Sequence, residues 1–311
     1  MAALVHLITY AALATLVIAV AGRAIRFYRL PVHLRWELYP VAHDLERVSH
    51  GGSYLEQLNW WTKPRRTSLI GELLVMVPEM LLIKALWENN RALWYRSFPF
   101  HFGLYISIGA AGLLLLGAAA ELLGFPVKAT ADAGMIGMAL YYLPILAGYT
   151  GLGLTLLGAI VLLHRRLSAP ELRNYASPAH VFNLAIFIAA FGFALLASVV
   201  RDHDFSLARG YLQSLLSLNL AAPVGSRAVA LEILLVSFLI AYVPLTHMSH
   251  FFMKWFTYHT VRWDDRPNLR GSKIEAEIQN LVKAPVTWAA PHLHADGKKN
   301  WVDIITEEWK S

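Results

Sequence analysis

Five long apolar runs dominate the pattern of the chain. They cover roughly 4–21, 98–120, 133–163, 179–200 and 228–253. A helix that crosses a bilayer needs about 20 mostly apolar residues, so each run is long enough to span a membrane. The first four runs contain no Asp, Glu, Lys or Arg, and Glu232 is the only acid within the fifth. We therefore predict an all-α, polytopic membrane bundle of five transmembrane helices with a cytoplasmic insertion and tail.

These runs divide the chain into four regions. We expect a first transmembrane helix at 1–22, a cytoplasmic or interfacial segment at 23–97, a four-helix membrane region at 98–253 and a cytoplasmic tail at 254–311. A further apolar stretch at 67–86 carries several charges and a proline. Because charge at mid-membrane depth is costly, we predict that it forms a helix at the membrane surface or against a partner.

The tail has its own structural signals. Ser272 and Glu275 have the spacing of a capping box, which predicts a helix that Pro285 ends. The last stretch, from Trp288 to Trp309, places three tryptophans among charged residues. Aromatic residues are enriched at protein interfaces, so we expect the tail to dock a soluble partner.

Charge predicts the orientation in the membrane. Only 15% of the residues are charged, against roughly 25% in soluble domains. With the N-terminus outside, 23 of the 27 Lys and Arg residues lie in cytoplasmic segments and 4 in outer loops. This satisfies the positive-inside rule, and we expect a multi-pass protein of the inner (cytoplasmic) membrane with a cytoplasmic C-terminus. The pI near 9.5 then reflects orientation in membrane lipid, and no nucleic-acid partner is expected.

Histidines are the candidate cofactor ligands. The chain has no cysteine and 13 histidines, so it cannot build an iron–sulfur cluster alone. His101, near the start of the second span, and His250, near the end of the fifth, lie at matching depth on the cytoplasmic side. Two axial imidazoles on different helices can hold the iron of haem b, and Gly103, Gly109 and Gly112 could make room for the macrocycle. The alternative is a pair of interfacial histidines that bond the neighbouring backbone.

Two further histidines lie on the same side. His247, one turn before His250, could replace it as ligand or serve a second site. His180, which opens the fourth span, is a candidate second ligand or quinone contact, with helix-end packing as the alternative. His6, near the N-terminus, is expected at the surface or the membrane interface.

Glu232 is the remaining unusual residue. In a continuous fifth helix it lies about 27 Å from His250, because each residue adds about 1.5 Å, and therefore near the outer face. An acid inside a span is a candidate for proton transfer, and Glu232 is the candidate proton acceptor. The alternative is a carboxylate paired with Arg227.

Four strings along the chain together resemble a known family. They are RWELYPVAHD at 35–44, LLHRRLSAPELR at 162–173, THMSH at 246–250 and WVDIITEEW at 301–309. With the five spans, they resemble the haem b subunits of the respiratory nitrate reductase gamma type. The chain looks closer to the branch found in sulfur-metabolism redox complexes, whose cytochrome pairs with a heterodisulfide-reductase-like iron–sulfur protein.

The resemblance implies a cytochrome b subunit that exchanges electrons between menaquinone or ubiquinone and a cytoplasmic iron–sulfur subunit. The family has two ligand histidines on each of the second and fifth spans. His101 and His250 match the cytoplasm-side pair, whereas Ala111 and Glu232 stand where the outer pair would be. One haem b is therefore expected, with a second that uses His180 or His247 as the alternative. The rival functions are a membrane transporter and a cofactor-free membrane anchor.

Overall fold

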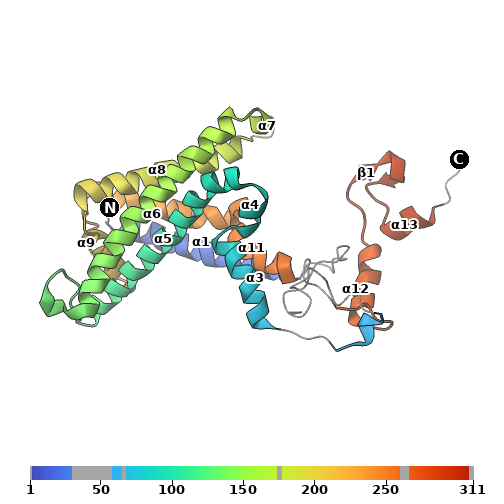
Figure 1. Cartoon of the computed structure of the whole chain (residues 1–311), viewed down its shortest axis with the longest axis horizontal. Coiled ribbons are helices and arrows are strands. Elements are labelled where there is room, and N and C mark those ends of the chain that lie inside the picture. Colours follow the sequence, from blue (N-terminus) through green and yellow to red (C-terminus); the bar gives the residue numbers. More distant parts are fainter. Residues whose placement is uncertain (1, 30–57, 65–67, 174–176, 260–265, 308–311) are drawn as a thin grey trace. The chain divides into compact units, whose positions relative to one another are not determined.

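The computed structural model describes residues 2–29, 58–64, 68–173, 177–259 and 266–307 (Figure 1). Within these residues, five helices are long and apolar enough to cross a membrane. The predicted all-α class with five candidate transmembrane helices is thus confirmed. The RWELYPVAHD string, with His43, lies outside the described residues, as does Trp309.

The five long helices match the five apolar runs. They are α1 (Ala2–Tyr28), α5 (Arg91–Leu122), α6 (Gly134–Ser168), α8 (Pro178–Arg201) and α10 (Arg227–Tyr242). Polar side chains begin three of them by accepting a bond from a backbone N–H one turn later: Asn90 for α5, Ser177 for α8 and Ser226 for α10. Such caps satisfy N–H groups that have no partner within the helix.

Shorter elements connect and extend these helices. They are η2 (Trp60–Thr62), α3 (Leu69–Leu81), α4 (Lys84–Asn89), η3 (Ala131–Ala133), α7 (Pro170–Arg173), α9 (Ser206–Leu216), η4 (Val243–Leu245), η5 (His247–Ser249), α11 (His250–Thr257), α12 (Lys273–Val282), β1 (Ala289–Ala290), η7 (Pro291–Leu293), β2 (Ala295–Asp296) and α13 (Trp301–Thr306). The predicted helix after Ser272 is confirmed as α12, and the 67–86 stretch forms two helices, α3 and α4.

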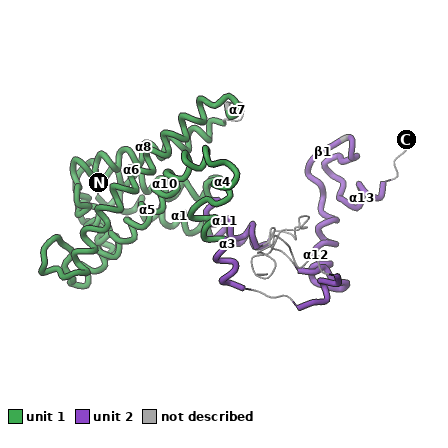
Figure 2. The backbone as a smooth tube through the Cα atoms, viewed as in Figure 1, with its two compact units in different colours: residues 1–20, 76–249 green, residues 21–75, 250–311 purple. Residues whose placement is uncertain are grey.

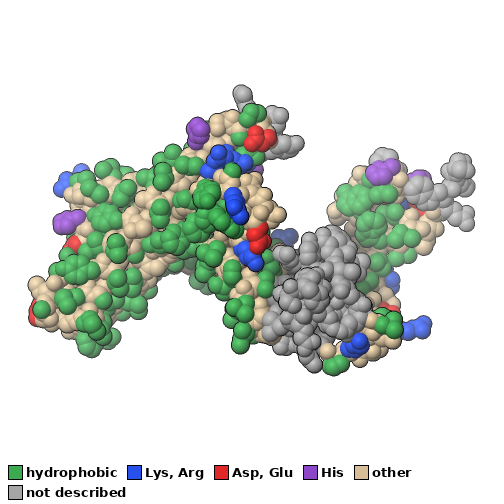
Figure 3. All heavy atoms as spheres, viewed as in Figure 1, with side chains coloured by type: hydrophobic (Ala, Val, Ile, Leu, Met, Phe, Trp, Pro, Cys, Tyr) green, Lys and Arg blue, Asp and Glu red, His purple; other side chains and the backbone are tan. Residues whose placement is uncertain are grey.

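The chain divides into two compact units (Figure 2). The first unit comprises residues 1–20 and 76–249, and the second comprises 21–75 and 250–311. In the first unit α5 packs along α6, α6 along α8 and α8 along α10, while α9 packs against α5. Hydrophobic side chains cover much of the face of this unit that Figure 3 shows, which is the surface expected of a bundle in lipid.

Small residues bring α5 and α6 close together. A Cβ added to Gly158 would lie 2.4 Å from the backbone nitrogen of Phe100, and one added to Gly103 would lie 2.4 Å from that of Thr155. Such contacts are typical of helices that associate in membranes. Gly103 therefore makes room for α6 and not for a macrocycle. Gly109 and Gly112 face open space instead, with no atom within 4 Å of an added Cβ.

One apolar layer joins four of the spanning helices. It consists of Phe100, Ala159, Phe187, Ala190 and Leu239, which come from α5, α6, α8 and α10. The rings of Phe100 and Phe187 meet edge to face at 5.2 Å. Leu104 of α5 and Met248 of η5 pack against the same layer. In lipid, packing of this kind stabilises the bundle chiefly through van der Waals contact.

The fifth span differs from the predicted run of 228–253. Its α-helix ends at Tyr242 and continues as two short 3-10 turns, η4 and η5, before α11 starts at His250. Pro244 explains the end of α10, since its nitrogen cannot donate a helical hydrogen bond, and Thr246 is extended. The estimate of 27 Å between Glu232 and His250 assumed a continuous helix, so it does not hold.

The second unit contains a small ordered tail. Strands β1 and β2 pair antiparallel, and Val286, Ala295 and Ile304 form a core beside them. Asn300 caps α13 by accepting a bond from the backbone N–H of Asp303. This region, residues 285–307, therefore has its own packing and caps.

Candidate functional site

His101 lies in the third turn of α5 and is half-buried. Its Nδ1 is 2.9 Å from the carbonyl oxygen of Ser97, one turn earlier in the helix. A carbonyl oxygen can only accept, so Nδ1 carries the proton and donates it. In neutral His101 the lone pair is then on Nε2. Iron-ligating histidines commonly show this arrangement, because the Nδ1–H bond orients the ring and selects the coordinating nitrogen.

His180 has the opposite tautomer. It is the third residue of α8. Its ring Nδ1 accepts a bond from the backbone N–H of Ser177 at 3.3 Å, and the backbone N–H of His180 donates to the Ser177 hydroxyl. In the neutral ring the proton is therefore on Nε2. Such a ring is suited to donate a hydrogen bond through Nε2 and not to ligate iron through it.

His247 belongs to a chain of hydrogen bonds that joins the start of α8 to the end of α10. The hydroxyl of Tyr242 donates to the Oδ1 atom of Asn183 at 2.7 Å, and Nδ2 of Asn183 lies 3.4 Å from Nε2 of His247. Since an amide nitrogen only donates, Nε2 of His247 accepts. The rings of His180 and His247 meet nearly at right angles, 5.5 Å apart. We call His180, Asn183, Tyr242 and His247 the histidine cluster.

His250 lies in the second unit, as the first residue of α11, whereas His101 lies in the first unit. Within the described residues, no group of three or more His, Cys, Asp or Glu side chains is arranged to hold a metal ion. A haem iron needs only two protein ligands, so the pairing of His101 with His250 stays a prediction.

Glu232 is half-buried in α10. Among the described residues its side chain makes no hydrogen bond or ion pair, and the alternative pairing with Arg227 is not found. It lies seven residues before Leu239 and so faces nearly the same way, about 10.5 Å further along the helix. Ala111 lies seven residues after Leu104 of α5, which runs antiparallel to α10. Both residues therefore lie on the α9 side of the apolar layer, where Glu232 is half-buried and Ala111 is exposed.

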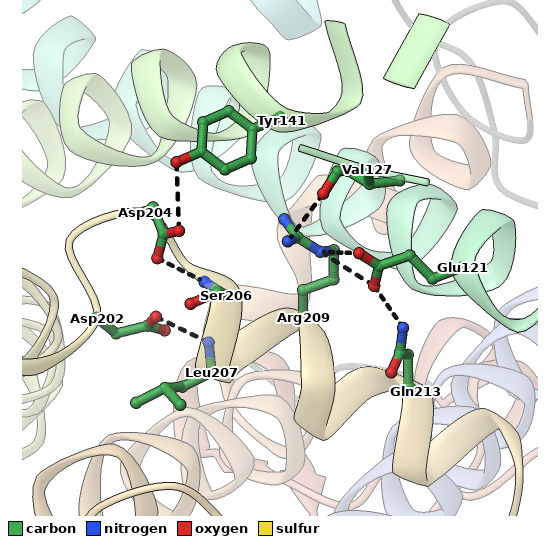
Figure 4. Close-up of polar contacts among 9 residues, drawn as sticks. All are labelled: Glu121, Val127, Tyr141, Asp202, Asp204, Ser206, Leu207, Arg209 and Gln213. Carbon is green, nitrogen blue, oxygen red and sulfur yellow. Dashed lines mark hydrogen bonds and ion pairs between the residues drawn. The ribbon is translucent and has the colours of Figure 1, made fainter. Parts of the chain in front are cut away.

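A network at the α9 end of the bundle was not predicted from the sequence (Figure 4). Arg209 of α9 is only 6% exposed, and its Nε lies 3.2 Å from both carboxylate oxygens of Glu121 at the end of α5. Gln213 also donates to Glu121, and Nη2 of Arg209 donates to the carbonyl oxygen of Val127 at 3.4 Å. Arg209 is one of the four basic residues expected in outer loops, and its side chain bonds α9 to α5.

Asp202, the residue after α8, bonds the first turn of α9. Its carboxylate accepts bonds from the backbone N–H groups of Leu207 at 2.8 Å and Ala208 at 2.9 Å. Burial raises the pKa of Asp202, while these two bonds oppose the shift. Asp204 accepts from the hydroxyl of Tyr141 in α6, so the connection between α8 and α9 is bonded to three helices.

His6 is fully buried, so its predicted place at the surface or interface is wrong. Its Nδ1 donates to the carbonyl oxygen of Ala2 at 2.9 Å, and its Nε2 lies 2.7 Å from the hydroxyl of Ser214 in α9. Thr9, three residues later on the same face, bonds the hydroxyls of Tyr211 and Ser237. Polar side chains three apart in an apolar run are a signal for bonds between helices, and these join α1 to α9 and α10.

Comparisons of the chain with protein-family models, curated proteins and solved structures find no match.

Proposed function

We propose that this chain is a cytochrome b membrane subunit that exchanges electrons between the quinone pool and a cytoplasmic iron–sulfur partner. The observation that carries the proposal is the bond from Nδ1 of His101 to the Ser97 carbonyl. The bond leaves the lone pair of neutral His101 on Nε2, as the same bond does for His6, and in a chain without cysteine such a lone pair can ligate the haem iron. The family resemblance supports the same function.

The hydrogen bonds of the described histidines support His101 over His180 and His247 as an Nε2 ligand of haem b. His101 has the required tautomer, while Nε2 of His180 carries a proton and Nε2 of His247 accepts from Asn183. We propose His101 as one axial ligand and, from the family resemblance, His250 as the other. When bound, the haem supplies one-electron transfer without binding oxygen.

The chain's own residues supply the proton handling that a quinone requires. Quinol oxidation releases two protons with its two electrons, so acceptor groups must lie near the headgroup. Glu232 is our candidate acceptor, since it is half-buried within a span and faces the same side of the apolar layer as Ala111. Quinone sites are apolar with few polar groups, and the small Ala111 side chain is exposed on α5.

The histidine cluster is the alternative site on the other side of the apolar layer. His180 offers an Nε2–H donor. The amide of Asn183 accepts from Tyr242 and donates to His247, and these two bonds orient the His247 ring. Menaquinone and ubiquinone carry carbonyl oxygens that accept such a donor. The two candidate sites lie toward opposite membrane faces, so variants at each can distinguish them.

We expect the partner to bind the tail. With the N-terminus outside, the tail is cytoplasmic. Trp288 and Trp301 meet edge to face at 5.7 Å and remain 43% and 39% exposed. Exposed tryptophans are typical anchors at protein interfaces, and we assign this pair to the contact with the iron–sulfur subunit.

The function is tested by adding quinol to membranes that contain the protein and recording visible absorbance. We expect ubiquinol or menaquinol to reduce a haem b chromophore in the wild type and in the matched control His164→Ala, which alters an exposed histidine at the end of α6. His101→Ala should remove the response. A chain with no chromophore that either quinol reduces would contradict the proposal.

A further inference from the structure

Helix α3 exposes its apolar side chains and turns its acidic side chains inward, the opposite of a surface helix on a soluble protein. Its exposed face consists only of apolar side chains, at Leu69, Ile70, Leu73, Leu74, Val77, Met80 and Leu81. Its two acids are on the opposite face with the buried Met76: Glu72 lies 3.4 Å from His259, and Glu79 bonds the backbone of α4. A surface helix in water normally places its charges outward, so water does not suit the exposed face of α3.

The end of α3 is fixed to a spanning helix. The hydroxyl of Tyr105 donates to the carbonyl oxygen of Met80 at 2.8 Å, and Nε1 of Trp94 donates to that of Leu82 at 2.7 Å. Tyr105 lies 14 residues into α5, about 21 Å from the start of that helix at 1.5 Å per residue. The last turn of α3 therefore lies beside a helix that crosses the membrane.

Three backbone polar groups at the turn between α3 and α4 are hydrogen-bonded within the protein. Ile83 adopts a left-handed conformation, with φ of 53°. Two carbonyl oxygens at this turn, of Met80 and Leu82, accept bonds from α5, and the backbone N–H of Ala85 in the first turn of α4 donates to Glu79 at 2.8 Å. In water these groups could bond solvent, whereas in hydrocarbon each unpaired group costs several kcal/mol. Non-helical backbone with such partners is the kind that membranes tolerate.

Length and flanking charge exclude a full crossing. The 13 residues of α3 extend about 20 Å, against a hydrocarbon core of about 30 Å. Basic residues flank α3 on both sides, with Lys63 before it and Lys84 and Arg91 after it. The ring of Trp87 lies against Trp94 and the Arg91 guanidinium, an arrangement typical of the membrane–water boundary.

We propose that α3 lies in one lipid leaflet with its apolar face toward the acyl chains, and that the turn at Ile83 leads the chain into α4 at the membrane–water boundary, where Lys84 and Glu88 are exposed. The occupant of the apolar face is the acyl chains of that leaflet. This selects the membrane over a protein partner among the two expected positions, and it is independent of haem and quinone.

Because the chain has no cysteine, single cysteines can report the environment of each face. We would place a spin label at Leu74→Cys and Val77→Cys in the full chain, reconstituted in phosphatidylethanolamine and phosphatidylglycerol vesicles. Ile108→Cys, on the exposed face of α5, is the lipid control, and Lys273→Cys, on α12, is the water control. We expect oxygen to relax the labels at 74, 77 and 108 more than a nickel chelate does, with the reverse order at 273.

A second measurement tests whether the two ends of α3 lie on the same side of the membrane. An impermeant maleimide added to one side of sealed, oriented vesicles should label Lys63→Cys and Lys84→Cys from the same side. Labelling from opposite sides would show that α3 spans the membrane. Labels at 74 and 77 that respond to the nickel chelate as 273 does, or that are shielded from both reagents, would show that water or protein covers the face. Each of these results would overturn the proposal.

Discussion

Nδ1 of His101 donates to the carbonyl oxygen of Ser97 at 2.9 Å, one turn earlier in α5. This bond distinguishes His101 from His180, whose Nδ1 accepts from a backbone N–H. The two rings therefore present different nitrogens, one with a lone pair and one with a proton. Chemically similar residues at one end of a bundle are thereby suited to different roles, metal ligation and hydrogen-bond donation.

Replacing Glu232 by Gln should slow quinol-dependent haem reduction. The variant keeps the shape of the side chain but cannot take a proton, and loss of general base catalysis typically costs about 10²-fold or more. Stopped-flow absorbance across a range of pH would measure the rate, with Glu171→Gln, in the exposed helix α7, as control. Wild-type rates at every pH would eliminate Glu232 and favour His180 and His247.

Deleting residues 286–311 should release the cytoplasmic partner. The deletion removes the tail core of Val286, Ala295 and Ile304 as a unit. A milder variant replaces Trp288 and Trp301 by Ala, with Trp61→Ala, another exposed tryptophan, as control. Copurification followed by iron analysis gives the stoichiometry. Retention of every cytoplasmic partner at its normal ratio would count against a docking role.

Gly158→Ala should destabilise the contact between α5 and α6. The new Cβ would lie 2.4 Å from the backbone of Phe100, whereas at Gly153, also in α6, it would meet no atom within 4 Å. Overpacking typically costs about 1–3 kcal/mol. Thermal unfolding in detergent should show a lower midpoint for Gly158→Ala than for Gly153→Ala. Equal midpoints would contradict the close packing described.

Breaking the Arg209–Glu121 pair should also cost stability. Glu121→Gln leaves a buried guanidinium without its counter-charge, and loss of one partner of a buried pair typically costs about 3–5 kcal/mol. The double variant with Arg209→Met should lose less than the sum of the single variants, because it removes both charges. A double-mutant cycle from unfolding curves measures this coupling. Additive effects would show that the two side chains act independently.

The spanning helices were predictable because each apolar run is itself the signal for a membrane helix, and the run needs no knowledge of its neighbours. The roles of Arg209 and His6 were not, since they depend on Glu121 and Ser214, which lie far away in the sequence. Pro244 did offer a local signal for the end of α10, which a continuous span of 228–253 ignored. The tautomers of His101 and His180 follow from their backbone partners, so they could be assigned only from the three-dimensional structure.

The most direct test of the central claim is the reduced-minus-oxidised visible spectrum of the purified chain, together with its extracted haem content. We predict a sharp alpha band of low-spin haem b in the wild type, its loss in His101→Ala and in His250→Ala, and its retention in His180→Ala and His247→Ala. A wild-type protein without the band would contradict the account and leave a transporter or a cofactor-free anchor. Full haem content and an unchanged spectrum in both His101→Ala and His250→Ala would contradict the ligand assignment.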